Sequence, residues 1–258
     1  MQCVVFFYFY TMNIKPYLDS TYLKTATHAG LSADENKIVV QSYVQEAIHE
    51  GFKLIMIRPN MVAMAKKMIV EAQSKVLVGT VIGFPEGIAS IEDKLVEAQK
   101  AIDDGADDLD FVCNYQAFID GKVALLKNEI LQGTSLGLKH NKTVKWIIEV
   151  AALTDQQIIQ LAALIKNIVI SNFKEDCYSS VFVKSSTGFY KTTDGLPNGA
   201  TVPSIILMLE NASPLPIKAA GGVKNYNEAI EMIKLGVKRI GTSSAKAIAA
   251  GYNATNSY

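Results

Sequence analysis

The sequence predicts a single-domain α/β protein, a (β/α)8 TIM barrel, and two features lead to that prediction. Short apolar, β-branched segments alternate with longer amphipathic segments from Leu18 onward. The chain shows eight such pairs with no Pro- or Ser-rich linker, and its 258 residues are an ordinary length for one barrel. Parallel strands joined by crossover helices explain the alternation, and a closed barrel uses all of the pairs.

The predicted strands are apolar along most of their length. This is expected where a parallel sheet is covered on both faces. The strands are predicted at residues 18–22, 52–58, 75–84, 107–113, 143–149, 179–186, 215–220 and 237–241.

The amphipathic segments between the strands predict helices, and several begin with a capping signal. Ser32 and Ser90 each precede acidic residues, and Thr154 has Gln157 at capping-box spacing. The helices are predicted at residues 34–49, 60–72, 90–104, 116–132, 154–171, 201–211, 225–235 and 243–250. Left-handed residues that end helices are expected at Gly51, Gly105 and Gly236.

Composition excludes several classes of function. Lys plus Arg and Asp plus Glu number 25 each, so no net field favours nucleic acid or a membrane surface as a partner. Three irregularly spaced cysteines predict neither a disulfide framework nor a zinc motif, and they indicate a reducing cytoplasm. The three histidines are widely separated, so a histidine-based metal site is not expected.

The first eleven residues, MQCVVFFYFYT, stand apart from the barrel pattern. Their apolar run is too short to span a bilayer, and it lacks the basic start and cleavage site of a signal peptide. We expect Met12 to be the true start and residues 1–11 to be a mis-assigned extension, with a poorly ordered tail as the second interpretation. The barrel domain is predicted to comprise residues 12–258.

Lysines at the ends of apolar strands are the strongest chemical signal, because barrels place active residues there. Lys184 ends one such strand, where a lysine either reaches solvent or loses its proton and becomes a nucleophile. Lys218 occupies the matching place on a later strand, and two like charges lower each other's pKa. Lys145 is a third strand lysine, and Asp110 could balance these charges and transfer a proton. A surface lysine and a structural salt bridge are the alternatives for single residues, but the group together favours amine catalysis.

Glycine-rich segments after the later strands predict a phosphate site. Backbone N–H groups exposed by glycine, hydroxyl groups and a helix N-terminus together bind anions without a net charge. The segments are Ser185-Ser186-Thr187-Gly188, Gly221-Gly222-Val223 and Gly241-Thr242-Ser243-Ser244. Two of them follow the last two strands, where barrels often bind phosphate.

Taken together, these residues resemble deoxyribose-phosphate aldolases from about Asp19 to the end of the chain. The likeness is specific because the lysine strand and the Lys-x-x-Gly-Gly strand occur in order at the right separation. The matching segments are LDST at 18–21, VIGFPEG at 81–87, GADDLD at 105–110, KWIIE at 145–149, FVKSSTGF at 182–189 and IKAAGGV at 217–223, together with the final Tyr258.

The resemblance implies a class I mechanism without metal or cofactor. Lys184 forms a Schiff base with C1 of open-chain 2-deoxyribose 5-phosphate, and Lys218 keeps it partly neutral. Asp110, helped by Lys145 and an ordered water, takes the proton from the C3 hydroxyl, and the C2–C3 bond breaks. Glyceraldehyde 3-phosphate leaves, and Tyr258 assists protonation of the acetaldehyde enamine at C2. The protonated imine serves as the electron sink.

The resemblance also implies a small phosphorylated sugar as the ligand and a homodimer as the assembly. The phosphate is assigned to Gly188, Gly222, Gly241, Ser243 and Ser244. The full set of expected substrate-binding residues is Asp19, Thr21, Ser185, Thr187, Gly188, Gly221, Gly222, Gly241, Ser243 and Ser244.

The chain departs from the family pattern in three places. Ser185 stands where threonine is common and keeps the hydroxyl group, and Met56 stands where cysteine is common, so no thiol behaviour is expected there. The segment from Tyr190 to Asn198 is longer than usual and lies beside the phosphate loops. Its Lys191 is expected to be exposed and solvated.

Two alternatives stay open at the level of sequence. One is another Schiff-base barrel acting on a different phosphorylated aldehyde, or a transaldolase-like enzyme. The other is a non-catalytic barrel that binds sugar phosphates, which predicts that one of the reactive groups is missing. Fold alone cannot separate these options, because barrels carry many chemistries.

Overall fold

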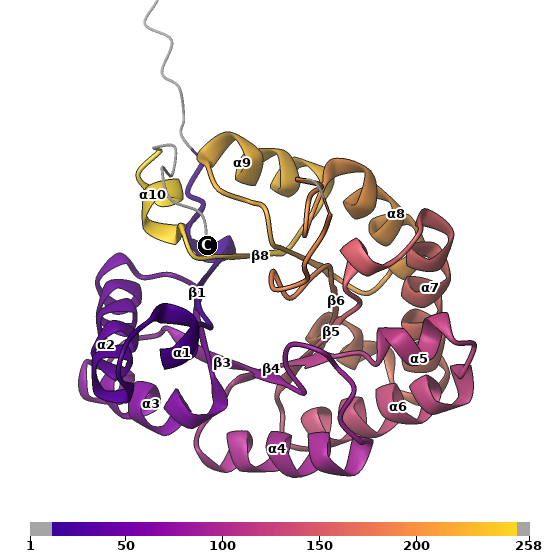
Figure 1. Cartoon of the computed structure of the whole chain (residues 1–258), viewed down its shortest axis with the longest axis horizontal. Helices are drawn as coiled ribbons and strands as arrows, with labels where there is room; N and C mark the ends of the chain where they lie inside the picture. Colours follow the sequence, from indigo (N-terminus) through magenta and orange to yellow (C-terminus); the bar gives the residue numbers. More distant parts are fainter. Residues whose placement is uncertain (1–11, 194, 252–258) are drawn as a thin grey trace, which may run out of the picture.

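The computed structural model describes residues 12–193 and 195–251, and these form a closed barrel of parallel strands (Figure 1). The strands are β1 Leu18–Tyr22, β2 Leu54–Ile57, β3 Leu77–Ile82, β4 Asp108–Val112, β5 Thr143–Ile147, β6 Val181–Lys184, β7 Ile217–Ala220 and β8 Arg239–Thr242. Each strand pairs with the next, and β8 closes the ring on β1 with Leu18 opposite Ile240. The predicted fold class and every predicted strand are confirmed.

Helices surround the strands on the outside, as Figure 1 shows. They are α1 Ala26–Ala29, α2 Ala33–Glu50, α3 Val62–Glu71, α4 Ile91–Asp103, α5 Tyr115–Ile119, α6 Val123–Lys139, α7 Asp155–Asn172, α8 Val202–Ala212, α9 Tyr226–Leu235 and α10 Ala245–Ala249. The 3-10 turns are η1 Lys15–Tyr17, η2 Pro59–Met61, η3 Val150–Ala152 and η4 Glu175–Ser180. The hydroxyls of Ser32, Ser90 and Thr154 accept hydrogen bonds from the first turns of their helices, as their positions predict.

The single helix predicted at residues 116–132 is wrong in two ways. The chain forms two helices there, because Gly121 takes a left-handed conformation at φ +77° between α5 and α6. The second helix also continues past residue 132 through Gly133 and Gly137. A Cβ on Gly133 would lie 2.8 Å from a ring carbon of Trp146. Local propensity predicts that glycine ends a helix. In α6 glycine instead allows close packing against the sheet.

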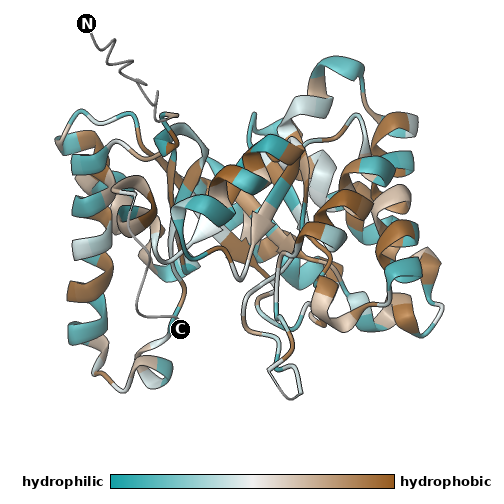
Figure 2. Ribbon diagram, turned by 90° about the horizontal axis from the view of Figure 1, so that it is seen from above, coloured by the Kyte–Doolittle hydropathy of each residue, from teal (hydrophilic) through white to brown (hydrophobic). Residues whose placement is uncertain are grey.

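The main hydrophobic core lies between the strands and the surrounding helices. Trp146 and Phe111, on neighbouring strands, stack with ring centroids 4.9 Å apart. The indole N–H of Trp146 donates to Thr134 Oγ1 of α6 at 3.0 Å, so this large side chain is buried without an unpaired donor. Figure 2 shows apolar residues along the central strands and alternating polar and apolar residues on the helices.

A smaller apolar cluster fills one part of the barrel interior. It consists of Leu23, Leu54, Met56 and Val81, with Phe84 and Phe189 packed against it. Met56 is completely buried there, so the position that often holds a cysteine contributes only packing in this chain. None of the helices in the described part of the chain is both long and apolar enough to cross a membrane.

A buried ion pair fixes the loops that follow β3 and β4. Lys94 of α4 pairs with Glu129 of α6, and its ammonium group also donates to the carbonyls of Gly87 at 2.6 Å and Val112 at 2.8 Å. Glu129 accepts the backbone N–H of Asn114 at 3.0 Å. The pair therefore holds two loops at the end of the barrel where the strands terminate.

Candidate active site

Two lysines on neighbouring strands share one carboxylate oxygen inside the barrel. Lys184 is the last residue of β6 and lies opposite Lys218 in the β6–β7 register. The Nζ atoms of Lys184 and Lys218 lie 2.8 and 2.9 Å from Oδ2 of Asp110. All three side chains are buried, with Lys184 the one that retains a little exposure, 3%. The sequence prediction that these residues come together is therefore met by the geometry.

The cluster extends further than the sequence suggested. Lys145 donates to Asp110 Oδ1 at 2.8 Å and to Asp108 Oδ2 at 2.7 Å. Arg239 donates from Nε to Asp19 Oδ1 at 2.7 Å and from its terminal nitrogen to Asp108 Oδ2 at 3.1 Å. Asp19 Oδ2 lies 2.6 Å from Lys218 Nζ.

Sequence reasoning missed Asp108 and Arg239. Strand alternation was the available signal for Asp108, because residues two apart on a strand point to the same side and Asp110 was already assigned. Arg239 begins the last strand and gave no comparable signal. With these two residues the cluster holds four basic side chains and three carboxylates. One positive charge is therefore unbalanced when all of them are ionised.

Lys184 is the amine that this environment favours for deprotonation. Burial lowers its pKa most, the attraction of Asp110 opposes that effect, and repulsion from Lys218 lowers the pKa further, to about 8. The expected effect of the second lysine is thus present, but burial is the larger cause. At pH 7 about a tenth of the Lys184 side chains are neutral.

Two of the groups around Lys184, Asp110 and Lys145, stay charged. Burial raises the pKa of Asp110, but Lys145, Lys184 and Lys218 outweigh it and hold that pKa well below its usual value. Burial lowers the pKa of Lys145, but Asp108 and Asp110 outweigh that and leave it raised. The site therefore presents one amine that can lose its proton beside a permanent carboxylate and a permanent ammonium group.

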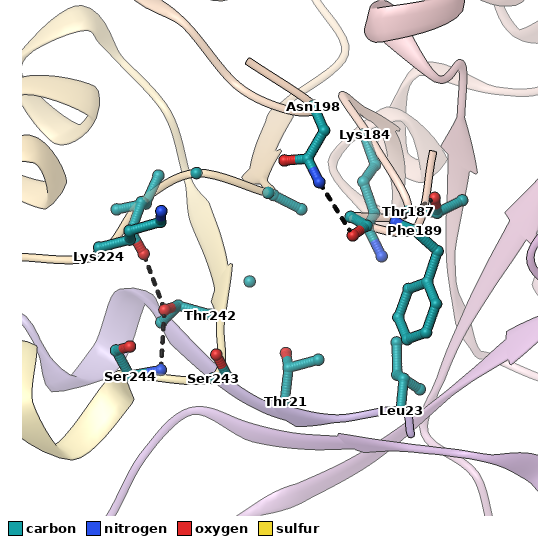
Figure 3. Close-up of a pocket in the computed structure, with 16 residues that line it drawn as sticks. Thr21, Leu23, Lys184, Thr187, Phe189, Asn198, Lys224, Thr242, Ser243 and Ser244 are labelled. Carbon is teal, nitrogen blue, oxygen red and sulfur yellow. Dashed lines mark hydrogen bonds between the residues drawn. The ribbon is translucent and has the colours of Figure 1, made fainter. Parts of the chain in front are cut away.

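A cavity of about 150 Å³ opens next to Lys184 and extends over the loops after β6, β7 and β8. Figure 3 shows Lys184, Thr187 and Phe189 on one side of it and Lys224, Ser243 and Ser244 on the other. The predicted substrate-binding residues that line it are Thr21, Thr187, Gly188, Gly221, Gly222, Gly241, Ser243 and Ser244. The amine and the glycine-rich loops thus face one cavity.

Two predicted contacts lie behind the cavity wall. Ser185 is buried, and its hydroxyl donates to the carbonyl of Ala220 at 2.8 Å and accepts the N–H of the same residue at 2.9 Å. Asp19 is buried in ion pairs with Lys218 and Arg239. These contacts position β6 against β7 and Lys218 against β1. Direct substrate contact by either residue stays a prediction.

The loops after β6 and β7 have backbone conformations that favour glycine over other residues. Gly188, Gly221 and Gly222 adopt φ values of +79°, +76° and +89°, which L side chains rarely adopt. A Cβ on Gly221 would also lie 2.9 Å from Cα of Gly199, in the segment that leads into α8. Main-chain amides in these loops are therefore not shielded by side chains and can approach an anion closely.

The cavity has further lining residues outside the predicted set of substrate-binding residues, namely Leu23, Phe189, Asn198, Ala220, Val223, Lys224 and Thr242. Lys224 matters most because it brings a cation next to the Gly-Gly loop. It directly follows the Gly221-Gly222-Val223 motif, so its place in the chain was the available signal. Asn198 donates to the carbonyl of Gly188 at 3.3 Å and ties the long segment to the cavity.

The remaining predictions concern residues at the edge of the site. Lys191 is exposed, as expected, and does not line the cavity. The orange segment between β6 and α8 in Figure 1 carries it, and Tyr190 in that segment meets Tyr115 edge to face at 6.4 Å. Tyr258 and residues 1–11 lie outside the described residues. Within residues 12–193 and 195–251, no three His, Cys, Asp or Glu side chains are grouped to hold a metal ion.

The curated relatives of this chain share one family name. No family model matches the chain. A deoxyribose-phosphate aldolase of Thermococcus gammatolerans is 36% identical over 241 residues, covering 93% of this chain and 96% of the relative. The protein of that name from Streptococcus pneumoniae serotype 2 is 34% identical over 248 residues, covering 96% and 100%.

Solved structures give the same result. The deoxyribose phosphate aldolase of Aeropyrum pernix, described as a tetramer, superimposes with a TM-score of 0.73 at 25% identity, over 92% of this chain and 89% of that one. A protein described as QR15, an aldolase, superimposes with a TM-score of 0.75 at 28% identity, over 93% and 96%.

Proposed function

This chain belongs to the deoxyribose-phosphate aldolase family, and we propose that it cleaves 2-deoxy-D-ribose 5-phosphate reversibly through a Schiff base on Lys184. The products are D-glyceraldehyde 3-phosphate and acetaldehyde. The observation that carries the proposal is the buried Lys184 amine, with its pKa lowered to about 8, at the head of a cavity whose far end is built of glycine loops.

The reaction begins at the aldehyde carbon of the open-chain sugar. The Lys184 ammonium group gives up a proton, and the neutral amine attacks C1 to form a carbinolamine. That proton returns when the carbinolamine hydroxyl leaves as water, so the product is a protonated imine. Lys145 remains an ammonium group beside Asp110 and does not compete as a nucleophile. Lys218 is fully buried between Asp19 and Asp110 and does not line the cavity. The positive imine nitrogen replaces the ammonium group of Lys184 beside Asp110, so the charge of the cluster is unchanged when the Schiff base forms.

Bond cleavage needs a base for the C3 hydroxyl and a sink for electrons. Asp110, with Lys145 and an ordered water, takes the hydroxyl proton. The electrons of the C2–C3 bond move to the imine nitrogen and leave an enamine on Lys184, while C3 becomes the aldehyde of glyceraldehyde 3-phosphate. Protonation at C2, assigned to Tyr258, and hydrolysis of the imine then release acetaldehyde and restore the amine.

The phosphate group is assigned to the glycine loops. Gly188, Gly222, Gly241, Ser243 and Ser244 supply amides and hydroxyls, and Lys224 adds the cation. Thr21, whose side chain lies between the two ends of the cavity in Figure 3, is assigned to the sugar hydroxyls. Asp19, Ser185, Thr187 and Gly221 support these groups from the cavity wall or directly behind it.

The proposal includes a cellular setting and an assembly. Cleavage of this sugar phosphate belongs to the breakdown of deoxyribonucleosides, and the free thiols of Cys113 and Cys177 are consistent with a reducing cytoplasm. We keep the homodimer as the proposed assembly. Light scattering of the purified protein would check it, and a tetramer mass, as described for the Aeropyrum pernix relative, would overturn it.

Trapping the covalent intermediate tests the mechanism. The protein is incubated with 2-deoxyribose 5-phosphate, reduced with borohydride and digested, and the added mass is located by mass spectrometry. We expect the adduct on Lys184, its absence in Lys184→Ala, and its persistence in Lys191→Ala, which removes an exposed lysine near the site.

An adduct on Lys218 or Lys145 would keep the reaction class but reassign the nucleophile. Tight binding without an adduct would favour a non-catalytic binding protein, and cleavage of another phosphorylated aldehyde in a substrate panel would favour a different aldolase.

A further inference from the structure

Glu149 lies beside the active site, but the proposed aldolase mechanism gives it no role. It follows β5 and adopts φ +58° and ψ +69°, a left-handed conformation that costs free energy for a residue with a side chain. The backbone on both sides is held to β6, since Ile148 N–H donates to Lys184 O at 3.0 Å and Val150 N–H to Ser185 O at 2.9 Å. Strain of this kind persists where the surroundings fix the chain, and it is common near functional sites.

The Glu149 side chain holds the loop that follows Lys184. Its Oε2 accepts the hydroxyl of Thr187 and the backbone N–H of the same residue, the latter at 3.2 Å. The Thr187 hydroxyl oxygen in turn accepts the N–H of Phe189 at 3.0 Å. Thr187, Gly188 and Phe189 all line the cavity, whereas Glu149 lies behind it. Glu149 is therefore hydrogen-bonded to this wall of the cavity through Thr187.

The charge of this carboxyl group is poorly compensated. Among the buried carboxyl groups in the described part of the chain, Glu149 is the one without an ion pair. Its Oε1 has no hydrogen-bond partner among those residues, and the same is true of the buried hydroxyl of Ser186 next in the loop. A buried anion with one unsatisfied oxygen is costly, so its neutral form is unusually accessible.

The electrostatics agree with this geometry. Burial raises the pKa of Glu149 most, and the hydrogen bonds from Thr187 and the charge of Lys184 lower it less, so it reaches about 7. The titratable groups that face it are Lys184 on β6 and Tyr115 on α5, whose own pKa is raised by burial and then by Glu149. The carboxyl group thus changes charge in the neutral range.

We propose that Glu149 is a positioning residue whose carboxylate holds Thr187, and with it the Gly188–Phe189 wall, in the shape that receives the sugar phosphate, and that protonation releases this wall. Hydrogen bonds to a charged acceptor are about twice as strong as those to a neutral one, so the protonated group holds the loop less firmly. The inference rests on the proposed function, because it assumes that the cavity receives that substrate.

The consequence is a binding affinity that falls as pH falls. If only the ionised form binds well, the apparent dissociation constant is divided by the ionised fraction, which changes about tenfold between pH 8 and pH 6 for a group titrating near 7. The ligand's own phosphate, with a pKa of about 6, adds about a twofold effect. These two contributions separate when the carboxyl group is removed.

The test uses 2-deoxyribitol 5-phosphate, which has no aldehyde and cannot react with Lys184. Its dissociation constant is measured by calorimetry from pH 6 to pH 8 for the wild type, Glu149→Gln and Glu97→Gln. Glu97 is the matched control, because its carboxylate also accepts a loop N–H, that of Gly83 at 2.7 Å, but in the loop after β3 and with no hydrogen bond to Thr187. We expect about a tenfold or larger weakening in the wild type and in Glu97→Gln. Glu149→Gln should bind weakly throughout, with only the twofold change.

A second variant tests the hydrogen bond between Glu149 and Thr187 by changing Thr187. Thr187→Val keeps the shape of the side chain but loses the hydroxyl, so it should also flatten the pH dependence, and adding Glu149→Gln to it should change little more. A Glu149→Gln profile like that of the wild type would overturn the inference. Cleavage of 2-deoxyribose 5-phosphate by the wild type is measured separately. Its absence would overturn the proposed function, whereas cleavage together with a pH-independent affinity would overturn this inference alone.

Discussion

Lys184 and Lys218 lie opposite each other on β6 and β7, and both ammonium groups contact the same oxygen, Oδ2 of Asp110, at 2.8 and 2.9 Å. One carboxylate oxygen cannot fully compensate two ammonium groups, and Asp110 also binds Lys145 through its other oxygen. Lys218 has Asp19 as a second partner at 2.6 Å, whereas Asp110 is the one carboxylate that Lys184 reaches among the described residues. The shortage of negative charge therefore falls on Lys184, the residue at the cavity.

Removing the second lysine should shift the pH dependence of the reaction. In Lys218→Leu the repulsion on Lys184 is lost and Asp110 is left to pair more fully with Lys184, so both changes raise the pKa of Lys184. We expect the rise of kcat/KM with pH, which follows deprotonation at about 8 in the wild type, to move about one unit higher. A pH–rate profile of both proteins checks this, with Lys191→Ala as a control that keeps the wild-type midpoint. An unchanged midpoint would mean that Lys218 does not act through Lys184.

Neutralising Asp110 should harm both catalysis and folding. Asp110→Asn keeps the size of the side chain but leaves the lysines without their shared counter-charge. Loss of the base should lower kcat by about 10²- to 10⁴-fold. Leaving buried ammonium groups unpaired should destabilise the fold by about 3–5 kcal/mol, less whatever is recovered when Lys184 loses its proton. Steady-state rates and urea unfolding measure the two effects. A variant that keeps the wild-type rate would exclude Asp110 as the base.

Lys224 should matter for the phosphate and for little else. It is the cavity cation nearest in sequence to the Gly221-Gly222 loop, and Figure 3 shows it on the side opposite Phe189. In Lys224→Ala we expect KM for 2-deoxyribose 5-phosphate to rise about tenfold, which corresponds to about 1.4 kcal/mol. Activity on unphosphorylated 2-deoxyribose should stay within about twofold of the wild type. Equal losses on both sugars would contradict a role in phosphate binding.

Gly137 should be a stability position, far from the chemistry. It lies in α6 against Val144 of β5, and a Cβ there would overlap a methyl group of that valine. Gly137→Ala gains up to about 1 kcal/mol of helix propensity, but overpacking against a fixed strand costs about 1–3 kcal/mol. We expect net destabilisation in urea unfolding with little change in KM. Ser135→Ala, on the exposed face of the same helix, is the matched control and should change stability by less than about 0.5 kcal/mol.

Local patterns in the chain were sufficient to predict the barrel. The strands from Leu18 to Thr242 follow apolar runs, and the helices after Ser32, Ser90 and Thr154 begin at side chains that cap them from within the same few residues. Lys184 could be assigned because it ends its strand and strand ends gather at one face of any such barrel. Lys218, the second residue of β7, could be assigned because it occupies the matching place on the neighbouring strand. These features depend on residues near one another in the chain, which is why the sequence alone predicts them.

Contacts between distant residues were decided by the tertiary structure. Arg239 reaches Asp19 from 220 positions away and Asp108 from 131, and no local pattern marks those partners. Gly133 and Gly137 read locally as helix breakers, yet α6 continues through them because Trp146 and Val144 occupy the space that their side chains would fill. Glu149 was visible only as a strand end, and its lack of an ion pair appears once the barrel is closed. Burial and charge balance are properties of the assembled core, so the pKa of Lys184 and the shape of the cavity follow from the fold as a whole.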